Sequence, residues 1–256
     1  MNLKELRQQP HLSYSALSTF LMCPLKFKFH YLDKIPDKSI ASCLIFGSAI
    51  HDIIGTYYAS FHENNEKPDQ EWLVSEFEKI WKELVAKQIL PIDYKPKSDF
   101  EALLDTGRKM VKAFHEAVTP GKIEGLEVPF SIEIPEVPAP LIGAFDVMEA
   151  GCLIELKTAA RKYSDTQISN NLQCNIYGLA MESLGLVEDT LIKLLVITKT
   201  KEPEVQPCYI IVDRKQNERT VRLIQTIWKS IQAGNFYPLQ NFTCGDCQYS
   251  KECKQF

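Results

Sequence analysis

Three charged residues interrupt an otherwise apolar pattern in the middle of the chain. Asp146 lies between an aromatic and a β-branched neighbour, and Glu155 and Lys157 lie among leucine and isoleucine. The surrounding apolar and β-branched residues predict two strands, 141–148 and 152–157, joined by a tight Glu-Ala-Gly turn. Charged side chains are costly to bury inside strands, so these three are the first candidates for chemistry.

The predicted hairpin would bring the three side chains together. Side chains two residues apart on a strand project to the same face, so Glu155 and Lys157 share a face, and cross-strand pairing can place Asp146 against them. Two buried carboxylates could hold a divalent cation, with the lysine beside it to meet a substrate anion. The alternative is an ion pair of Lys157 with Asp146 or Glu155 on an exposed hairpin face, and the hairpin alone leaves both interpretations open.

Two predicted helices carry polar residues that could face such a site. In the first helix, Gly47 and His51 are four residues apart and share a face, and the histidine is either a core residue or a metal ligand. In the second, predicted over 166–184, Gln173 and Tyr177 have the same spacing, which places an amide and a phenol on one face. Neither pair identifies a function by itself.

Eight cysteines occur in a chain whose polar N-terminal sequence is unlike a signal peptide, which argues against a disulfide framework. Three of them form the pattern Cys244-x2-Cys247-x5-Cys253, and Cys23 is the natural fourth. Four thiolates bind zinc or an iron–sulfur cluster, and unligated thiols are the remaining possibility. Either metal centre would join the N-terminal part to the C-terminal tail.

Length and composition limit the class of protein. The 256 residues are 45% hydrophobic, which is enough for one sizeable core, and no apolar run is long enough to span a membrane. We therefore expect a cytoplasmic protein with no membrane partner. The net charge of −4 does not indicate a nucleic-acid-binding protein, although a local basic groove would suffice for one.

The order of these motifs resembles that of a known enzyme family. Gly143-x-x-Asp146 followed by Glu155-x-Lys157 looks like the core of the PD-(D/E)XK nuclease superfamily. Within that superfamily the chain resembles the RecB-like and AddB-like exonucleases with an iron–sulfur cluster, and most closely the CRISPR-adaptation exonucleases. The further residues that carry the resemblance are Cys23, Gly47, His51, Gln173, Tyr177, Cys244, Cys247 and Cys253.

The resemblance implies a fold. The expected class is α/β, with a restriction-endonuclease-like core in which a mixed central sheet is flanked by helices. A helical N-terminal part and a cysteine-rich C-terminal tail would be added to this core. We expect a single RecB-like nuclease domain over 1–256, with a mainly helical lid and the histidine motif in 1–120, the catalytic sheet in 121–212, and a helix and cluster-binding tail in 213–256.

The resemblance also implies an active site. It implies a metal-dependent DNA exonuclease that hydrolyses phosphodiester bonds by means of Mg²⁺ or Mn²⁺. The implied metal ligands are His51, Asp146, Glu155 and the main-chain carbonyl of Leu156. The implied catalytic residues are Asp146, Glu155, Lys157, Gln173 and Tyr177, of which the lysine acts on the attacking water or the phosphate and the last two position the DNA.

The same resemblance implies a [4Fe-4S] cluster and a set of partners. The implied cluster ligands are Cys23, Cys244, Cys247 and Cys253. DNA with single-stranded or duplex ends would be the substrate, and CRISPR-adaptation or recombination proteins would be protein partners. Two alternatives stay open: a DNA-end-binding accessory subunit with little or no cleavage, and a zinc-stapled structural protein whose hairpin charges are ion pairs.

Overall fold

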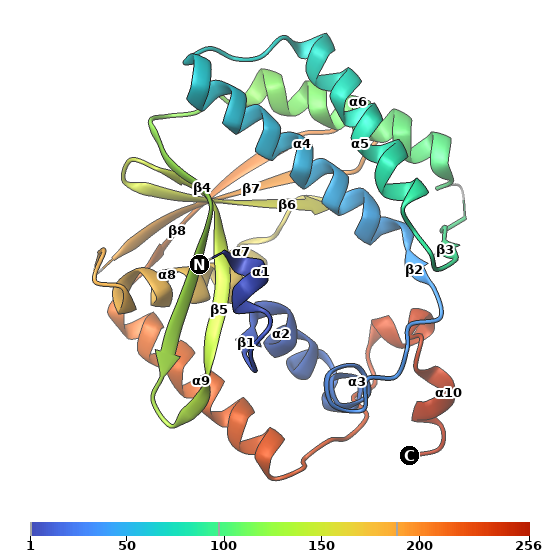
Figure 1. Ribbon diagram of the computed structural model, residues 1–256, viewed down its shortest axis with the longest axis vertical. Helices are drawn as coiled ribbons and strands as arrows, with labels where there is room; N and C mark the ends of the chain where they lie inside the picture. Colours follow the sequence, from blue (N-terminus) through green and yellow to red (C-terminus); the bar gives the residue numbers. More distant parts are fainter. Residues whose placement is uncertain (1, 97, 188) are drawn as a thin grey trace.

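A six-stranded mixed sheet forms the centre of the computed structural model, which describes residues 2–96, 98–187 and 189–256 (Figure 1). The strand order is β1-β5-β6-β7-β8, and β4 pairs with β5. Pairs β1–β5 and β6–β7 are parallel, and the other pairs are antiparallel. The strands are β1 (Leu12–Ser13), β4 (Ile123–Ile134), β5 (Val137–Glu149), β6 (Cys152–Ala159), β7 (Thr190–Thr198) and β8 (Val205–Val212).

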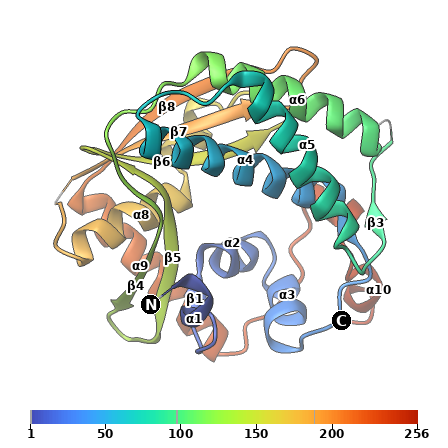
Figure 2. The same ribbon diagram turned by 45° about the horizontal axis from the view of Figure 1, so that its top comes forward.

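Three helices cover one face of this sheet. They are α4 (Ser42–Asn64), α5 (Gln70–Ala86) and α6 (Phe100–Ala117), and α4 lies nearest to the strands (Figure 2). Their apolar side chains form one core with residues of β6 and β7, among them Ile154 and Leu195. A short parallel pair, β2 (Ile40–Ala41) and β3 (Ile92–Asp93), flanks the ends of these helices.

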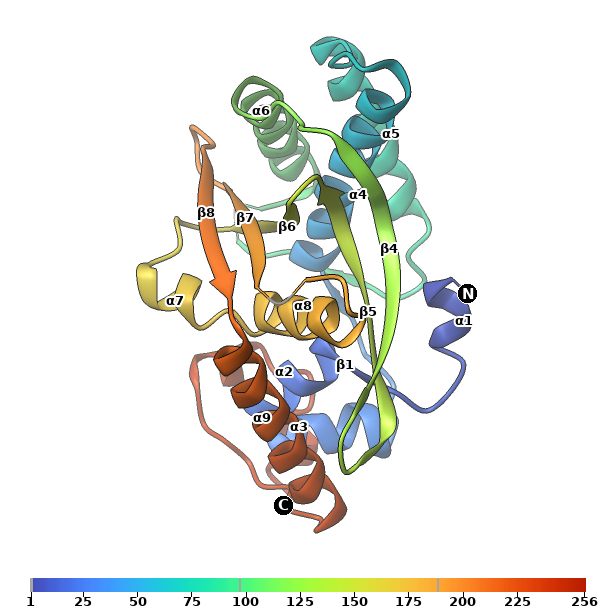
Figure 3. The ribbon, with the colours of Figure 1, turned by 90° about the vertical axis from the view of Figure 1, so that its left-hand side faces the viewer.

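The opposite face is covered by α2 (Tyr14–Met22), α8 (Leu172–Ser183) and α9 (Arg214–Gln232). Figure 3 shows the sheet between α8 and α9 on one side and α4 to α6 on the other. The two layers bury β7 on both faces, which explains its continuous apolar sequence. The predicted mixed sheet flanked by helices is confirmed.

The crossover between β6 and β7 differs from the prediction. A single helix was expected over 166–184, whereas the chain forms α7 (Asp165–Ser169) and then α8. The side chain of Asn171 accepts a hydrogen bond from the Cys174 amide at 3.1 Å and so caps α8 at its N-terminus. Asparagine competes for backbone hydrogen bonds in this way, which ends one helix and starts the next.

The cysteine-rich tail packs against the N-terminal part of the chain. After α2 come α3 (Pro24–Phe27) and a π-helical turn (Lys28–Leu32), and the tail contains a 3₁₀ turn (Phe242–Asp246) and α10 (Ser250–Cys253). Figures 1 and 2 both place α3 beside α10. No helix in the described residues is long and apolar enough to cross a lipid bilayer.

Candidate active site

One edge of β5 is only partly paired, and the candidate site lies at this gap. β4 follows β5 along its other edge for almost its whole length. The edge opposite β4 pairs with β1 at residues 141 and 142 and with β6 at residues 147 to 149. Among the described strands, residues 143–146 have no ladder partner on this edge. Asp146 therefore lies where β5 and β6 separate.

Side chains replace the missing ladder bonds at the gap. Asp146 Oδ2 accepts a hydrogen bond from the Leu156 amide at 3.1 Å, and the Tyr177 hydroxyl donates to the Ala144 carbonyl at 2.7 Å. The N–H and C=O of one strand residue point to the same edge, so the Leu156 carbonyl also faces the gap. At the gap, main-chain and carboxylate oxygens therefore take no part in the ladder of hydrogen bonds between strands.

Glu155 lies beside the gap and is almost completely buried, with 1% of its side chain exposed. Glu155 Oε1 is 2.5 Å from Lys157 Nζ, so the prediction that these two side chains share a face is confirmed. Glu155 Oε2 is buried and has no hydrogen-bond partner among the described residues. Burial raises the pKa of Glu155 to about 7, against the lowering effect of Lys157. The ion pair considered from the sequence is present, but it is buried and leaves one oxygen unsatisfied.

Lys157 starts a chain of hydrogen bonds that runs to α8. Its Nζ donates to Gln173 Oε1 at 2.6 Å, and Gln173 Nε2 donates to the Tyr177 hydroxyl at 3.3 Å. The Tyr177 hydroxyl is also 3.3 Å from Asp146 Oδ1. The hydroxyl has a single proton, which it donates to the nearer acceptor, the Ala144 carbonyl. It can donate to Asp146 only when that bond is broken. The structure therefore brings the predicted pair on α8 to the carboxylates.

His51 reaches the same carboxylate from α4. His51 Nε2 is 3.3 Å from Asp146 Oδ2. The hydrogen bond to Asp146 raises the pKa of His51 although burial opposes the charged imidazole. Burial also disfavours the ionised Asp146, but the bonds to His51 and to the Leu156 amide outweigh it and lower the pKa of Asp146. Gly47 and His51 line one cavity of about 200 Å³ beside Lys157, so they share the predicted face.

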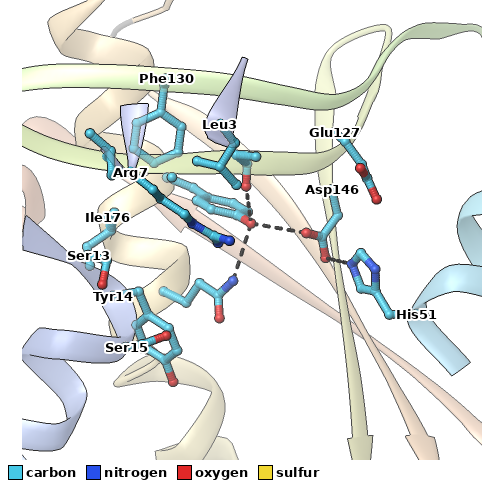
Figure 4. Close-up of a pocket in the computed structure, with 15 residues that line it drawn as sticks. Leu3, Arg7, Ser13, Tyr14, Ser15, His51, Glu127, Phe130, Asp146 and Ile176 are labelled. Atoms are coloured by element: carbon cyan, nitrogen blue, oxygen red, sulfur yellow. Dashed lines mark hydrogen bonds and ion pairs between the residues drawn. The ribbon is translucent and has the colours of Figure 1, made fainter. Parts of the chain in front are cut away.

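A larger cavity of about 310 Å³ opens over the gap (Figure 4). Of the predicted residues, His51, Asp146, Gln173 and Tyr177 line it. It is also lined by Tyr14 and Ser15 of α2, by Arg7, and by Glu127 of β4. Glu127 has a left-handed backbone with φ of 46°, which is rare for a residue other than glycine. In the sequence, neither Arg7 nor Glu127 differs from an ordinary surface charge, and only the folded chain places them here.

A family model for the PD-(D/E)XK nuclease superfamily matches residues 11–254. The chain belongs to the PD-(D/E)XK nuclease superfamily. A crystal structure of a Eubacterium rectale protein, described provisionally as an exonuclease, aligns with a TM-score of 0.58 at 12% identity, covering 99% of this chain and 90% of that one. This likeness shows a common fold.

A second solved structure, of SSO0001, aligns with a TM-score of 0.38 at 14% identity, covering 94% of this chain and 95% of that one. That TM-score is too low to establish a common fold. A comparison with curated proteins finds no match.

The side chains at the gap have the chemistry that a PD-(D/E)XK nuclease needs to bind a divalent cation. Carboxylate oxygens, a main-chain carbonyl and an imidazole suit Mg²⁺ or Mn²⁺. Glu155 Oε2, which is buried and has no hydrogen-bond partner in the part of the chain that the structure describes, is the atom that a cation would satisfy. In the described residues, however, no three His, Cys, Asp or Glu side chains are close enough to hold an ion as they stand. To bind a cation, Glu155 would have to give up its contact with Lys157, and Asp146 its contact with His51.

The four cysteines singled out by their spacing line one cavity of about 520 Å³. The Leu239 amide donates to Cys23 Sγ at 3.5 Å, and the Asn241 amide donates to Cys244 Sγ at 3.4 Å. Zn–S bonds of about 2.3 Å would bring four thiolates to about 3.8 Å from one another. The described cysteines are not gathered around a single ion in this way. Four thiolates around one cavity are a donor set for either zinc or an iron–sulfur cluster.

Proposed function

We propose that this chain is a divalent-metal-dependent DNA exonuclease of the RecB-like type. The observation that carries the proposal is the gap between β5 and β6, where Asp146, Glu155 and Lys157 converge and one buried carboxylate oxygen has no partner among the described residues. Membership of the superfamily supports phosphodiester hydrolysis. Action at DNA ends is supported by the sequence resemblance to RecB-like exonucleases.

In this proposal, the oxygen-rich gap holds the cation. Asp146, Glu155, His51 and the Leu156 carbonyl would be its protein ligands. When bound, Mg²⁺ or Mn²⁺ would supply an activated water and would neutralise charge on the scissile phosphate. The imidazole favours Mn²⁺ as an activator, because nitrogen ligands suit transition metals better than magnesium.

The remaining residues position the reacting groups. Lys157 Nζ, held by Gln173 at 2.6 Å, would orient the attacking water or contact the phosphate. The Tyr177 hydroxyl fixes the unpaired Ala144 carbonyl and approaches Asp146, so it would hold the carboxylate in place for its ligand role. Gln173 joins Lys157 to Tyr177 and would keep the lysine directed at the gap when Glu155 turns to the cation.

We further propose that Cys23, Cys244, Cys247 and Cys253 bind a [4Fe-4S] cluster. Their shared cavity and the amide bonds to two sulfur atoms support this assignment. The cluster would be structural, because hydrolysis of a phosphodiester transfers no electron. DNA ends are the proposed substrate, and CRISPR-adaptation or recombination proteins are the proposed partners on the resemblance alone.

Cleavage of end-labelled DNA tests the nuclease proposal. Anaerobically purified protein is mixed with single- and double-stranded substrates in Mn²⁺, Mg²⁺ or EDTA, beside Asp146→Ala and Lys157→Ala. We expect metal-dependent cleavage that each substitution lowers at least 100-fold, by roughly 3 kcal/mol of lost transition-state stabilisation. The matched controls are Asp105→Ala and Lys109→Ala, which remove an exposed ion pair on α6 and should leave cleavage unchanged. Stepwise shortening from an end would show exonuclease action, and internal fragments would contradict it.

The accessory-subunit alternative has one observation in its favour. No group of side chains among the described residues is preformed for a cation. If protein with full iron content binds labelled DNA ends but cleaves them under none of these conditions, the chain is a binding subunit and the catalytic proposal is wrong.

A further inference from the structure

The first residues described in the chain form a wall of the cavity over the gap. The short helix α1 (Leu3–Leu6) is closed by a capping box, in which the Asn2 side chain accepts from the Glu5 amide and the Glu5 side chain accepts from the Asn2 amide, both at 2.9 Å. The Arg7 amide then bonds to the Leu3 carbonyl at 3.1 Å. α1 lies against β4 and β5, and Leu3 and Arg7 line the cavity together with Asp146.

Arg7 is the cation of this wall, and no described residue neutralises its charge. Among the described residues, no carboxylate lies within ion-pair distance of its guanidinium, whereas Lys157 is paired with Glu155 at 2.5 Å. Figure 4 shows Arg7 reaching into the cavity from the side opposite Asp146, His51 and Glu127. The cavity therefore has an acidic side, suited to a cation, and a basic side formed by Arg7.

This division suits two successive phosphates of a nucleic-acid backbone. The phosphate to be cleaved must meet the cation and Lys157, and the next phosphate along the strand carries its own negative charge. A guanidinium presents a planar fork of donors that binds phosphate oxygens in pairs. Ser13, Ser15 and Tyr14 also line the cavity and offer hydroxyl groups and an aromatic face.

We propose that Arg7 binds the backbone phosphate of the nucleotide next to the scissile phosphate. This inference rests on the proposed nuclease function and adds a substrate-binding residue to it. The contact exists before and during cleavage, so it contributes uniform binding rather than transition-state stabilisation. Loss of the guanidinium should therefore raise KM and leave kcat nearly unchanged.

Kinetics and salt dependence test this inference in the full chain. We expect Arg7→Gln to raise KM about tenfold, with kcat within about twofold of the wild type. The slope of the logarithm of DNA affinity against the logarithm of salt concentration, measured in EDTA to prevent cleavage, should fall by about 0.7 to 0.9, the value of one lost phosphate contact. Arg7→Lys keeps the charge, so it should keep the slope and recover part of the affinity.

Lys4→Gln is the matched control, because Lys4 is an exposed cation on α1, the helix that Arg7 follows directly, and does not line the cavity. It should leave KM and the salt slope unchanged. Unaltered KM and slope in Arg7→Gln, from protein whose wild type cleaves DNA, would overturn this inference and leave the nuclease proposal standing. An equal loss in Lys4→Gln would also overturn it, by showing that any charge on α1 acts. If the wild type neither cleaves nor binds DNA, the nuclease proposal fails and the role of Arg7 fails with it.

Discussion

Glu155 is a residue that folding leaves incompletely satisfied. Its side chain is 1% exposed, one oxygen binds Lys157, and the other has no hydrogen-bond partner in the described part of the chain. A buried polar atom of this kind costs stability unless a ligand satisfies it. The alternation of residues 155 and 157 could be predicted from the sequence, but the unsatisfied oxygen could not, because it depends on how closely α8 covers the strand.

The stability of the metal-free protein should therefore depend on the protonation of Glu155. Burial raises its pKa from 4.5 to about 7, so the folded protein holds this proton more tightly than the unfolded chain does. The resulting penalty is absent below pH 4.5 and grows as the pH rises to about 7, where it reaches on the order of 2–3 kcal/mol. Urea unfolding in EDTA between pH 4 and 8 should show the wild type losing this much relative to Glu155→Gln.

The comparison with Glu155→Gln contains its own control. Other titrating groups, such as His51, affect both proteins nearly equally, so their effects cancel when the two free energies of unfolding are subtracted. Addition of Mn²⁺ at pH 7.5 should raise the free energy of unfolding of the wild type more than that of Glu155→Gln. Parallel pH profiles for the two proteins would show that Glu155 is not the group responsible.

Arg7 and Glu127 show why residues of a site can escape sequence analysis. Arg7 lies several residues before the first strand, in a segment without a periodic hydrophobic pattern, so the sequence does not predict the direction of its side chain. Glu127 adopts a left-handed backbone that non-glycine residues rarely have, and its sequence context is that of an ordinary strand. Both positions are set by the packing of β4, β5 and α1, which is tertiary information.

At the scale of whole elements, hydrophobic periodicity predicted most of the helices and strands. β6 begins at Cys152 as predicted, whereas β5 begins at Val137 instead of residue 141. The break between α7 and α8 was not predicted, because its signal is one asparagine cap within the mostly polar stretch 164–173, most of which lies in the single helix predicted over 166–184. Element type was therefore predictable, whereas boundaries set by single side-chain bonds were not.

The packing of α8 on the sheet depends on a glycine. A Cβ on Gly178 would lie 2.4 Å from Val212 of β8, which is closer than atoms can approach. We expect Gly178→Ala to destabilise the fold by about 1–3 kcal/mol, through overpacking that shifts the helix carrying Gln173 and Tyr177. Chemical denaturation measures the loss, and cleavage activity should fall with it.

Gly55→Ala is the matched control in α4. A Cβ there meets no atom within 4 Å, so the substitution should stabilise the protein by about 0.5–1 kcal/mol through helix propensity. Opposite signs for the two substitutions would support the packing argument. A neutral or stabilising Gly178→Ala would show that α8 can move away from β8 at no cost.

At the scale of the whole molecule, direct contacts already join the N-terminal part to the tail. The Leu25 amide donates to the Tyr237 carbonyl at 3.1 Å, and the Asn241 side chain donates to the Met22 carbonyl at 2.9 Å. Tyr249, 1% exposed, packs on Leu25 and Phe29 beside Cys247 and Cys253. The four cysteines line one cavity within this junction, so the proposed cluster there would reinforce an existing interface.

If the four cysteines hold the proposed cluster, removal of one of them should weaken the junction and release its iron. We expect Cys244→Ala to lose its iron and to lower the unfolding free energy by about 3 kcal/mol, or roughly 6–12 °C in Tm. Cys43→Ala, which removes an exposed cysteine outside the cavity, should retain both iron and Tm. Iron analysis and thermal unfolding of anaerobically purified proteins provide the measurement. A Cys244→Ala protein that lacks iron but keeps its full yield and activity would contradict a structural role.

The contacts between α3 and the tail can form only after the tail has been synthesised. A ribosome adds about 5–20 residues per second, so Cys244 emerges about 10–40 s after Cys23. Throughout that interval Leu25 and Phe29 lack the tyrosine that later covers them. A nascent chain therefore exposes an apolar surface and the Cys23 thiol until residues 244–253 have been synthesised. The proposed cluster could therefore be inserted, and this apolar surface covered, only after residues 244–253 have left the ribosome.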